Sequence, residues 1–211
     1  MIPRDKVLIG LPCYDFKIDT ECMEGLFHCL PYYGGRIIYG GCSEIALARS
    51  DIAHRFVEKY TSYDWLMFID SDTGFSLDDW RYLWEGDEDI VIASYAKKFL
   101  GEPHNEFGLG FTRIHRRVFE QLKELKTEEG EEKLPRFFHK GEMKVHYFPS
   151  GAFNSRWTGE DTGFFMWAAY TDAKVRLEKR TKLKHFGRLA YQYPEQIPGY
   201  ARIEKPEDGA Q

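Results

Sequence analysis

The sequence predicts an α/β protein whose central sheet is Rossmann-like, mostly parallel and flanked by helices. Through the first half of the chain, short apolar runs alternate with amphipathic helical patterns, which is typical of a parallel sheet. The run at 65–70 (WLMFID) ends abruptly in an acid, as strands do where an α/β sheet opens onto a ligand. The run at 90–95 (IVIASY) is rich in Val and Ile, which favours burial on both faces.

The first strand is expected at 6–12 (KVLIGLP), an apolar run that ends at a proline and therefore at a loop. Residues 23–30 favour a helix. The glycine pair at 34–35 then turns the chain into a second strand, GRIIYGG at 35–41.

A helix is expected after the second strand. Apolar side chains there recur at steps of three and four residues, at Ile45, Ala48, Ile52, Phe56 and Tyr60. Ser43 is a suitable N-cap, and Glu44 is favourable in the first turn. Further on, Ser76 and Asp79 have the spacing of a capping box and should open another helix.

The second half of the chain is less regular. A strand is expected at 107–115, followed by a helix with Val118, Leu122 and Leu125 on its buried side. The segment 128–133 (EEGEEK) is expected to be an exposed acidic loop, and 144–149 (KVHYFP) another strand. A last helix should begin at Glu160 and Asp161 and run through Tyr170.

Length and composition fit one domain. At 211 residues the chain can bury a single large core, and 43% apolar and 16% aromatic residues are typical of a folded globular protein. We expect this domain over 1–198 and a flexible tail over 199–211. No leader-like segment opens the chain and no run reaches the ~20 apolar residues of a membrane span, so a cytoplasmic protein is expected.

The formal charge of −5 gives no general attraction to nucleic acid. Basic residues are concentrated at 174–188, where Glu178 is the single acid. We interpret this stretch either as a solvated strand face or as a surface for a diphosphate or a polyanion. No CxxC spacing occurs among the cysteines, which are therefore expected to be reduced thiols, at Cys13, Cys22, Cys29 and Cys42.

Asp70 and Asp72 directly follow a strand that is expected to be buried. Two carboxylates at the carboxyl end of a central strand offer oxygen ligands for a divalent cation, and hence a place for phosphate groups. The similar pair Asp87 and Asp89 precedes its strand and is expected at the opposite end of the sheet. The Asp-x-Asp spacing alone therefore does not identify a site.

Six segments, taken in order, resemble a known family. They are ALARSD (46–51), FIDSD (68–72), ASYAKK (93–98), GLGFTRIHRR (108–117), GED (159–161) and HFG (185–187). With these segments the chain is similar to GT-A-type glycosyltransferases, especially to family 2 members of the small bacterial, phage and viral type. The resemblance implies the GT-A fold, with a nucleotide-binding half at about 1–98 and an acceptor-binding half at about 99–198.

The resemblance also implies a chemistry. The protein would be a metal-dependent hexosyl- or pentosyltransferase that moves a sugar, with inversion, from a nucleotide-diphosphate sugar, in particular a UDP-sugar, to an acceptor hydroxyl. Asp72 is the expected direct metal ligand, and Asp70 lies near the ribose or on a metal-bound water. His185 would complete the metal shell, and an imidazole ligand favours Mn²⁺ over Mg²⁺.

The expected general base is Asp161, which would take the proton from the acceptor hydroxyl, and the adjacent Glu160 could exchange roles with it. Because Asp161 stands at the start of a helix, the helix dipole is expected to lower its basicity.

The same resemblance assigns contacts to the nucleotide-sugar. They involve residues after the first strand, on the first long helix, within the acidic motif and after the strand at 90–95, namely Pro12, Tyr14, Asp15, Arg49, Asp70, Ser71, Lys97 and Lys98. Arg49 and the residues after the first strand would contact the base. The chain departs from the family pattern at Ser50 and Asp51, where an Asn is usual.

Two acceptor classes follow from the resemblance: a glycan on a protein or cell surface, and a hydroxymethylated base in phage DNA. The negative charge of the chain disfavours DNA, whereas the basic stretch at 174–188 favours it. Segments 100–106 and 126–158 are expected to shape the acceptor pocket. Their aromatic rings suit stacking on a sugar or a base, at Phe137, Phe138, Phe153 and Trp157.

Two other functions are compatible with parts of the sequence. An apolar strand ending in Asp-x-Asp also begins the motif of haloacid-dehalogenase-like phosphatases, but that motif needs Thr or Val where this chain has Gly74. A transferase-like module that binds a nucleotide or a glycan without turnover would carry the same carboxylates.

Overall fold

The computed structural model describes residues 4–13, 16–33, 35–96, 103–104, 108–153 and 156–185. After a short 3-10 turn (Arg4–Lys6), these residues form five helices: α1 (Thr20–Tyr33), α2 (Ile45–Glu58), α3 (Leu77–Leu83), α4 (Arg116–Lys123) and α5 (Glu160–Ala168). The strands are β1 (Val7–Cys13), β2 (Arg36–Gly41), β3 (Trp65–Ile69), β4 (Thr73–Gly74), β5 (Ile90–Ala96), β6 (Pro103–His104), β7 (Phe111–His115), β8 (Arg136–His139), β9 (Glu142–Val145), β10 (Gly151–Phe153), β11 (Arg156–Thr158) and β12 (Val175–His185).

One eight-stranded sheet forms the centre of the fold, in the order β2-β1-β3-β7-β5-β12-β4, with β6 paired to β5. Strands β2, β1 and β3 are parallel, and so are β5 and β12. Strand β7 runs antiparallel between β3 and β5. The mostly parallel α/β sheet predicted from the alternating pattern is confirmed, with β7 as its reversed central strand.

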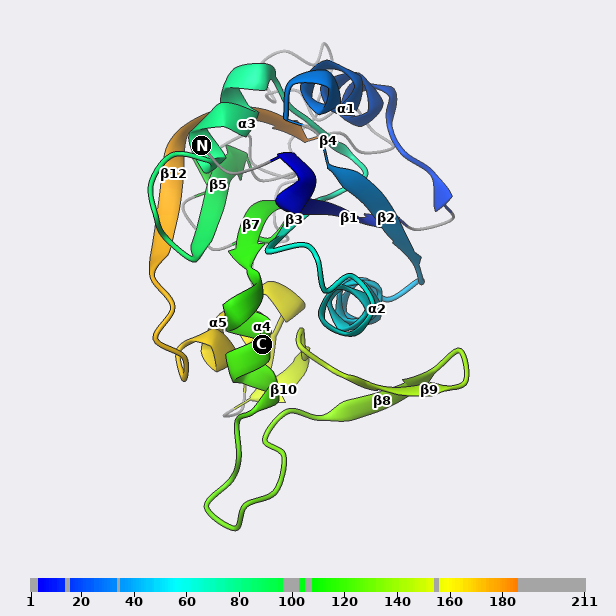
Figure 1. Cartoon of the computed structure of the whole chain (residues 1–211), viewed down its shortest axis with the longest axis vertical. Coiled ribbons are helices and arrows are strands. Elements are labelled where there is room, and N and C mark those ends of the chain that lie inside the picture. Colours follow the sequence, from blue (N-terminus) through cyan, green and yellow to red (C-terminus); the bar gives the residue numbers. More distant parts are fainter. Residues whose placement is uncertain are drawn as a thin grey trace, which may run out of the picture.

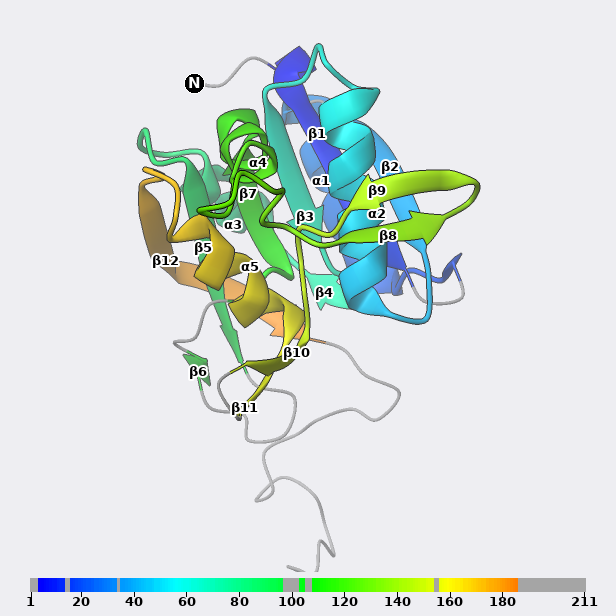
Figure 2. The same ribbon diagram turned by 90° about the horizontal axis from the view of Figure 1, so that it is seen from below.

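Helices cover both faces of this sheet, with α1 and α3 on one face and α2, α4 and α5 on the other (Figures 1 and 2). Each face has its own buried apolar cluster. All seven residues of β1 are buried, as expected for a strand that is covered on both sides. A few polar side chains are buried within the sheet, at Thr112 and Arg113 of β7 and at Glu178 of β12, whereas Asp70 and Asp72 lie beyond the carboxyl end of β3.

The ends of several elements differ from the sequence-based expectation. Helix α2 begins at Ile45 with Glu44 as N-cap and without a side-chain cap, one residue later than Ser43 would place it. The strand expected at 144–149 lies at Glu142–Val145, because Tyr147 leaves the hairpin to pack in the core. Helix α5 ends at Ala168 rather than at Tyr170. The capping box between Ser76 and Asp79 is confirmed.

A hairpin made of β8 and β9 lies against α2 (Figure 2). Asp51 of α2 forms a buried ion pair with Lys144 of β9, and their side chains are 5% and 3% exposed. The next contact is a hydrogen bond of 2.8 Å between Ser50 Oγ and His146 Nδ1. Ser50 and Asp51, which depart from the expected sequence pattern, thus attach the hairpin and the residue after it to α2.

The second acidic pair lies at the amino end of β5, as expected. Asp89 is bound there by Arg117 and by the backbone N–H of Lys174, at 2.9 Å in the second case. On β12, Glu178 is buried and accepts hydrogen bonds from Arg176 and Arg180, whereas the lysines of this strand are exposed. In the part of 174–188 that the structure describes, the lysines therefore lie on an exposed strand face, which fits both interpretations of this stretch.

All four cysteines are free thiols. In the described ranges, no helix has both the length and the apolar character that a membrane crossing requires.

Candidate active site

The acidic motif forms a tight turn directly after β3. The backbone N–H of Thr73 donates to the carbonyl of Asp70 at 3.0 Å, and the N–H of Asp70 donates to the carbonyl of Gly110 at 2.8 Å. The carbonyl of Ser71 accepts from the N–H of Asp19 at 2.8 Å. Because the main chain of this turn is closed by its own hydrogen bond and tied to two other parts of the fold, its two carboxylates have fixed starting points.

Arg49 of α2 joins this turn to the start of α5. Its Nη2 donates to Asp70 Oδ1 at 2.7 Å, and its Nη1 donates to Glu160 Oε1 at 2.5 Å and to Asp161 Oδ1 at 2.9 Å. The Arg49 side chain is 1% exposed, while the three acids are 17–28% exposed. Three carboxylates far apart in the sequence therefore meet around one buried cation; we call Arg49, Asp70, Glu160 and Asp161 the Arg49 cluster.

The segment before β7 completes this arrangement. A Cβ atom built on Gly110 would lie 2.7 Å from Asp70 Oδ2, so only glycine leaves room for the Asp70 carboxylate where it stands. The backbone N–H of Leu109 hydrogen-bonds the Asp161 carboxylate. Segment 108–110 therefore contacts Asp70 and Asp161 through its main chain.

The carboxyl of Asp161 has a pKa above that of an ordinary aspartate. Burial raises the pKa of its carboxyl to about 7, and the negative charges of Glu160 and Asp70 act in the same direction, against the Arg49 guanidinium. The sequence-based expectation that the helix dipole lowers the basicity of Asp161 is therefore wrong. Burial beside two other acids outweighs the dipole at this helix start.

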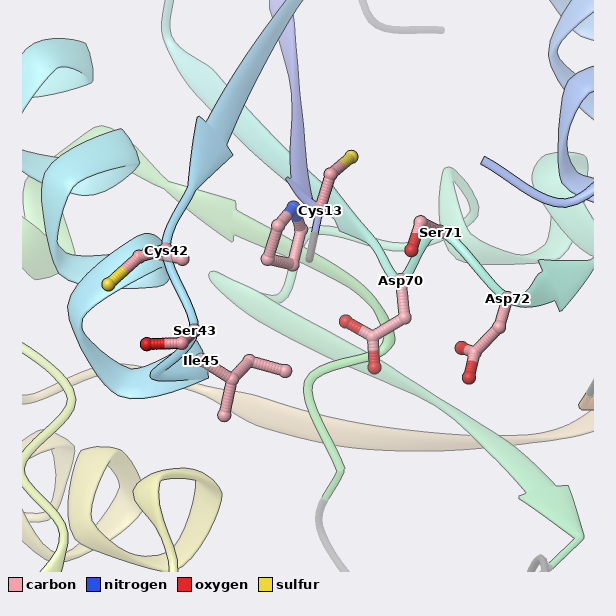
Figure 3. Close-up of a pocket in the computed structure, with 9 residues that line it drawn as sticks. Cys13, Cys42, Ser43, Ile45, Asp70, Ser71 and Asp72 are labelled. Carbon is pink, nitrogen blue, oxygen red and sulfur yellow. The ribbon is translucent and has the colours of Figure 1, made fainter. Parts of the chain in front are cut away.

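A cavity of about 190 Å³ opens beside the turn, between the ends of β1, β2 and β3 and the first turn of α2. Its lining consists of Pro12, Cys13, Cys42, Ser43, Ile45, Ala48, Asp70, Ser71 and Asp72. Figure 3 shows the carboxylates of Asp70 and Asp72 pointing in the same direction, while the Cys13 sulfur points the other way. The cavity thus has two carboxylates on one wall and small or apolar side chains on the other.

The donor set around this turn fits a hard divalent cation. Carboxylate oxygens suit Mg²⁺ and Mn²⁺, which commonly take one or two carboxylates from the protein and other ligands from phosphates and water. His185 pairs with Thr73 across β12 and β4, so its main chain lies beside the residue that follows Asp72; its side chain lies outside the described part. Among the residues that the structure describes, no three His, Cys, Asp or Glu side chains form a ready metal cluster.

The structure brings most of the described candidate residues to one place. Asp70, Arg49, Glu160 and Asp161 are in direct contact, and Pro12, Ser71 and Asp72 line the adjoining cavity. Seven of the candidate residues have side chains outside the part that the structure describes, namely Tyr14, Asp15, Lys97, Lys98, Phe153, Trp157 and His185. The expected tail at 199–211 also lies outside it.

Sequence reasoning missed two features of the site. Arg49 was expected to contact the nucleotide base, whereas its guanidinium is occupied by three carboxylates. Gly110 attracted no separate expectation, although the GLG sequence before a strand was a signal for close backbone approach.

No protein-family model and no curated protein matches the chain. Solved structures do match it at low sequence identity. A197 from STIV superposes with a TM-score of 0.53 at 18% identity, over 86% of this chain and 85% of that one. The catalytic domain of Drosophila beta1,4-galactosyltransferase 7, in complex with xylobiose, gives a TM-score of 0.51 at 18% identity, over 83% of this chain and 66% of that one.

A mutant of the same Drosophila enzyme, in complex with manganese, UDP-Gal and xylobiose, gives a TM-score of 0.53 at 14% identity, over 94% of this chain and 76% of that one. These likenesses establish the fold. The chain has a mixed α/β, GT-A-type glycosyltransferase fold with a large, mostly parallel central sheet, as the six segments predicted.

Proposed function

We propose that the protein is a metal-dependent glycosyltransferase that uses a nucleotide-diphosphate sugar and inverts the anomeric carbon. The observation that carries this proposal is the Arg49 cluster, in which a strand-end acid and two helix-start acids meet beside a cavity. Open α/β sheets bind ligands at this edge, beyond the carboxyl ends of their strands.

The two carboxylates on the cavity wall have different surroundings. One carboxylate oxygen of Asp70 accepts a hydrogen bond from Arg49, and the other lies against Gly110, so contacts within the protein fix the position of this carboxylate. Asp72 lies farther along the same wall and is the residue we assign to the cation, with His185 as the second protein ligand. A bound Mn²⁺ or Mg²⁺ would neutralise the charge that develops on the departing diphosphate.

The Asp161 carboxylate is assigned to the acceptor. It would take the proton from the acceptor hydroxyl while that oxygen bonds to the anomeric carbon and the bond to the diphosphate oxygen breaks. A pKa of about 7 suits this role, because the group is partly ionised at neutral pH and is still a useful base. One displacement without a protein nucleophile inverts the configuration, so an inverting transfer follows from this assignment.

A UDP-sugar donor and a glycan acceptor are the first choices for a test. The Drosophila neighbour is in complex with UDP-Gal, manganese and xylobiose, and the fold is shared. The charge of −5 also argues for a neutral acceptor rather than nucleic acid.

The decisive experiment is a donor screen with purified protein, in which thermal shift and UDP or GDP release are measured with Mn²⁺ and after chelation. We expect at least one donor to stabilise the protein and to be turned over only with the metal. Asp72→Ala should abolish metal-dependent nucleotide binding and keep the fold. Asp87→Ala is the matched control, because Asp87 is 86% exposed at the other end of the sheet. If neither donor binding nor turnover is found, or if Asp72→Ala binds normally, the proposal is wrong.

A further inference from the structure

We propose that Arg49 is a positioning residue that holds the donor-side acid Asp70 at a fixed spacing from the acceptor-side acids Glu160 and Asp161. This inference rests on the proposed function, since it assigns Arg49 a part in the same reaction. It replaces the expected contact between Arg49 and the nucleotide base with a contact between the two sides of the site.

The Arg49 side chain links three separate parts of the chain. Arg49 lies on α2, Asp70 follows β3, and the two other acids open α5. The guanidinium nitrogen Nη2 donates a hydrogen bond to Asp70, on the sugar-donor side of the site, at 2.7 Å. The nitrogen Nη1 donates to Glu160 and Asp161, on the sugar-acceptor side, at 2.5 and 2.9 Å. The two sides of the site are therefore bound by different nitrogens of one rigid group.

Charge explains why a cation is needed between these acids. Three carboxylates that share one small region repel each other, and each is held away from water in part. Arg49 supplies the positive charge from inside the fold, since only 1% of its side chain is exposed. A guanidinium that is buried and bound on both edges is poorly available to a nucleotide base.

The shape of the group explains why it is an arginine. The guanidinium is planar and its nitrogens are fixed relative to each other, so two carboxylates bound to different nitrogens have a defined separation. A lysine ammonium carries the same charge on one atom and on a flexible stem. Arg49→Lys should therefore keep the charge of the cluster and lose the spacing between its two sides.

The test compares Arg49→Lys with Arg117→Lys. Arg117 binds Asp89 in a bidentate ion pair at the opposite end of the sheet, so its replacement removes the same kind of contact without touching the site. UDP binding in the presence of Mn²⁺ is measured by calorimetry, and stability is measured as the midpoint temperature of thermal unfolding. Sugar transfer is measured as kcat and KM with the donor that the wild-type protein turns over. All rates are measured well below the unfolding temperature of the less stable variant.

For Arg49→Lys we expect a fold close to wild type, UDP affinity within about threefold and a fall in kcat of about 100-fold, the scale of a misplacement of 1 Å. Arg117→Lys should leave kcat and UDP affinity unchanged.

Three results for Arg49→Lys would overturn the proposal. A kcat near the wild-type value means that the spacing does not matter. A large loss of UDP affinity with kcat retained at saturation means that Arg49 contacts the nucleotide. A protein that does not fold makes Arg49 a requirement of the fold itself. Failure of the proposed function is distinct, because then the wild-type protein itself neither binds UDP with Mn²⁺ nor turns over any donor.

Discussion

Replacing Gly110 by alanine should damage the site through a single methyl group. The added Cβ would lie 2.7 Å from Asp70 Oδ2 and 3.1 Å from Asp70 Cγ, and distances below 3.0 Å require a shift. Asp70 cannot move away freely, because its other oxygen is held by Arg49 at 2.7 Å and its backbone N–H is bound to the Gly110 carbonyl. The methyl group must therefore displace either the carboxylate or the main chain of segment 108–110.

The expected size of the effect follows from this geometry. Overpacking of this kind costs about 1–3 kcal/mol, which for a domain of this size is a fall of roughly 2–12 °C in Tm. A displaced Asp70 also disturbs the spacing of the Arg49 cluster, so kcat should fall by about 100-fold.

The assay combines thermal unfolding with turnover of the donor found for the wild-type protein. Gly10→Ala is the matched control: its Cβ would lie at the same 2.7 Å, but from Ile52 Cγ2 in the apolar core. We expect similar destabilisation from both variants and a large loss of kcat from Gly110→Ala alone. Equal kcat values in the two variants, measured below both Tm values, would refute the reasoning.

Three further predictions concern pH and a buried ion pair. Because the pKa of Asp161 is raised to about 7, kcat/KM should fall tenfold per pH unit below about pH 7; a flat profile down to pH 5 would contradict the assignment of Asp161 as base. Burial lowers the pKa of His146 below its usual 6.5, so the unfolded chain takes up the proton first. The free energy of unfolding should therefore decrease as the pH falls below about 6.5, and chemical denaturation of the wild type and of His146→Gln, in which this part of the slope should vanish, measures it. Lys144→Met removes one of the two cations that bind the buried Asp51 carboxylate and leaves the other, Arg55 at 3.1 Å, so it should cost about 1–3 kcal/mol rather than the full loss of a buried pair. Lys140→Met, on the exposed turn of the same hairpin, should cost little, and equal urea midpoints would disprove the importance of the pair.

The sequence predicted the fold class and the ends of the sheet well, because those features follow from local patterns. Apolar runs marked the strands, and the position of Asp70 and Asp72 after one run, against Asp89 before another, assigned the two acidic pairs to opposite ends. Glu160 and Asp161 were recognised from a short motif at a helix start, and the structure has them in the first turn of α5.

The contacts across the site were not predictable in the same way. Nothing near Arg49 in the sequence shows that its guanidinium is buried, or that one of its partners is Asp161, 112 positions away. The raised pKa of Asp161 was not predictable for the same reason, because it comes first from burial in the folded protein and in part from the charge of Asp70, which follows β3. The roles of Ser50 and Asp51 also depended on a hairpin whose docking no local pattern describes.

The reversed direction of β7 has a consequence for how the site tolerates change. Because β7 runs against β3 and β5, the chain enters it at the edge where its neighbours end, and residues 109 and 110 arrive beside Asp70 and Asp161. Amide and carbonyl groups are common to almost all amino acids, so this wall of the site survives most exchanges of residue identity. We expect substitutions to disturb this wall through bulk at position 110, or through a proline at position 109, which would remove the N–H that binds Asp161.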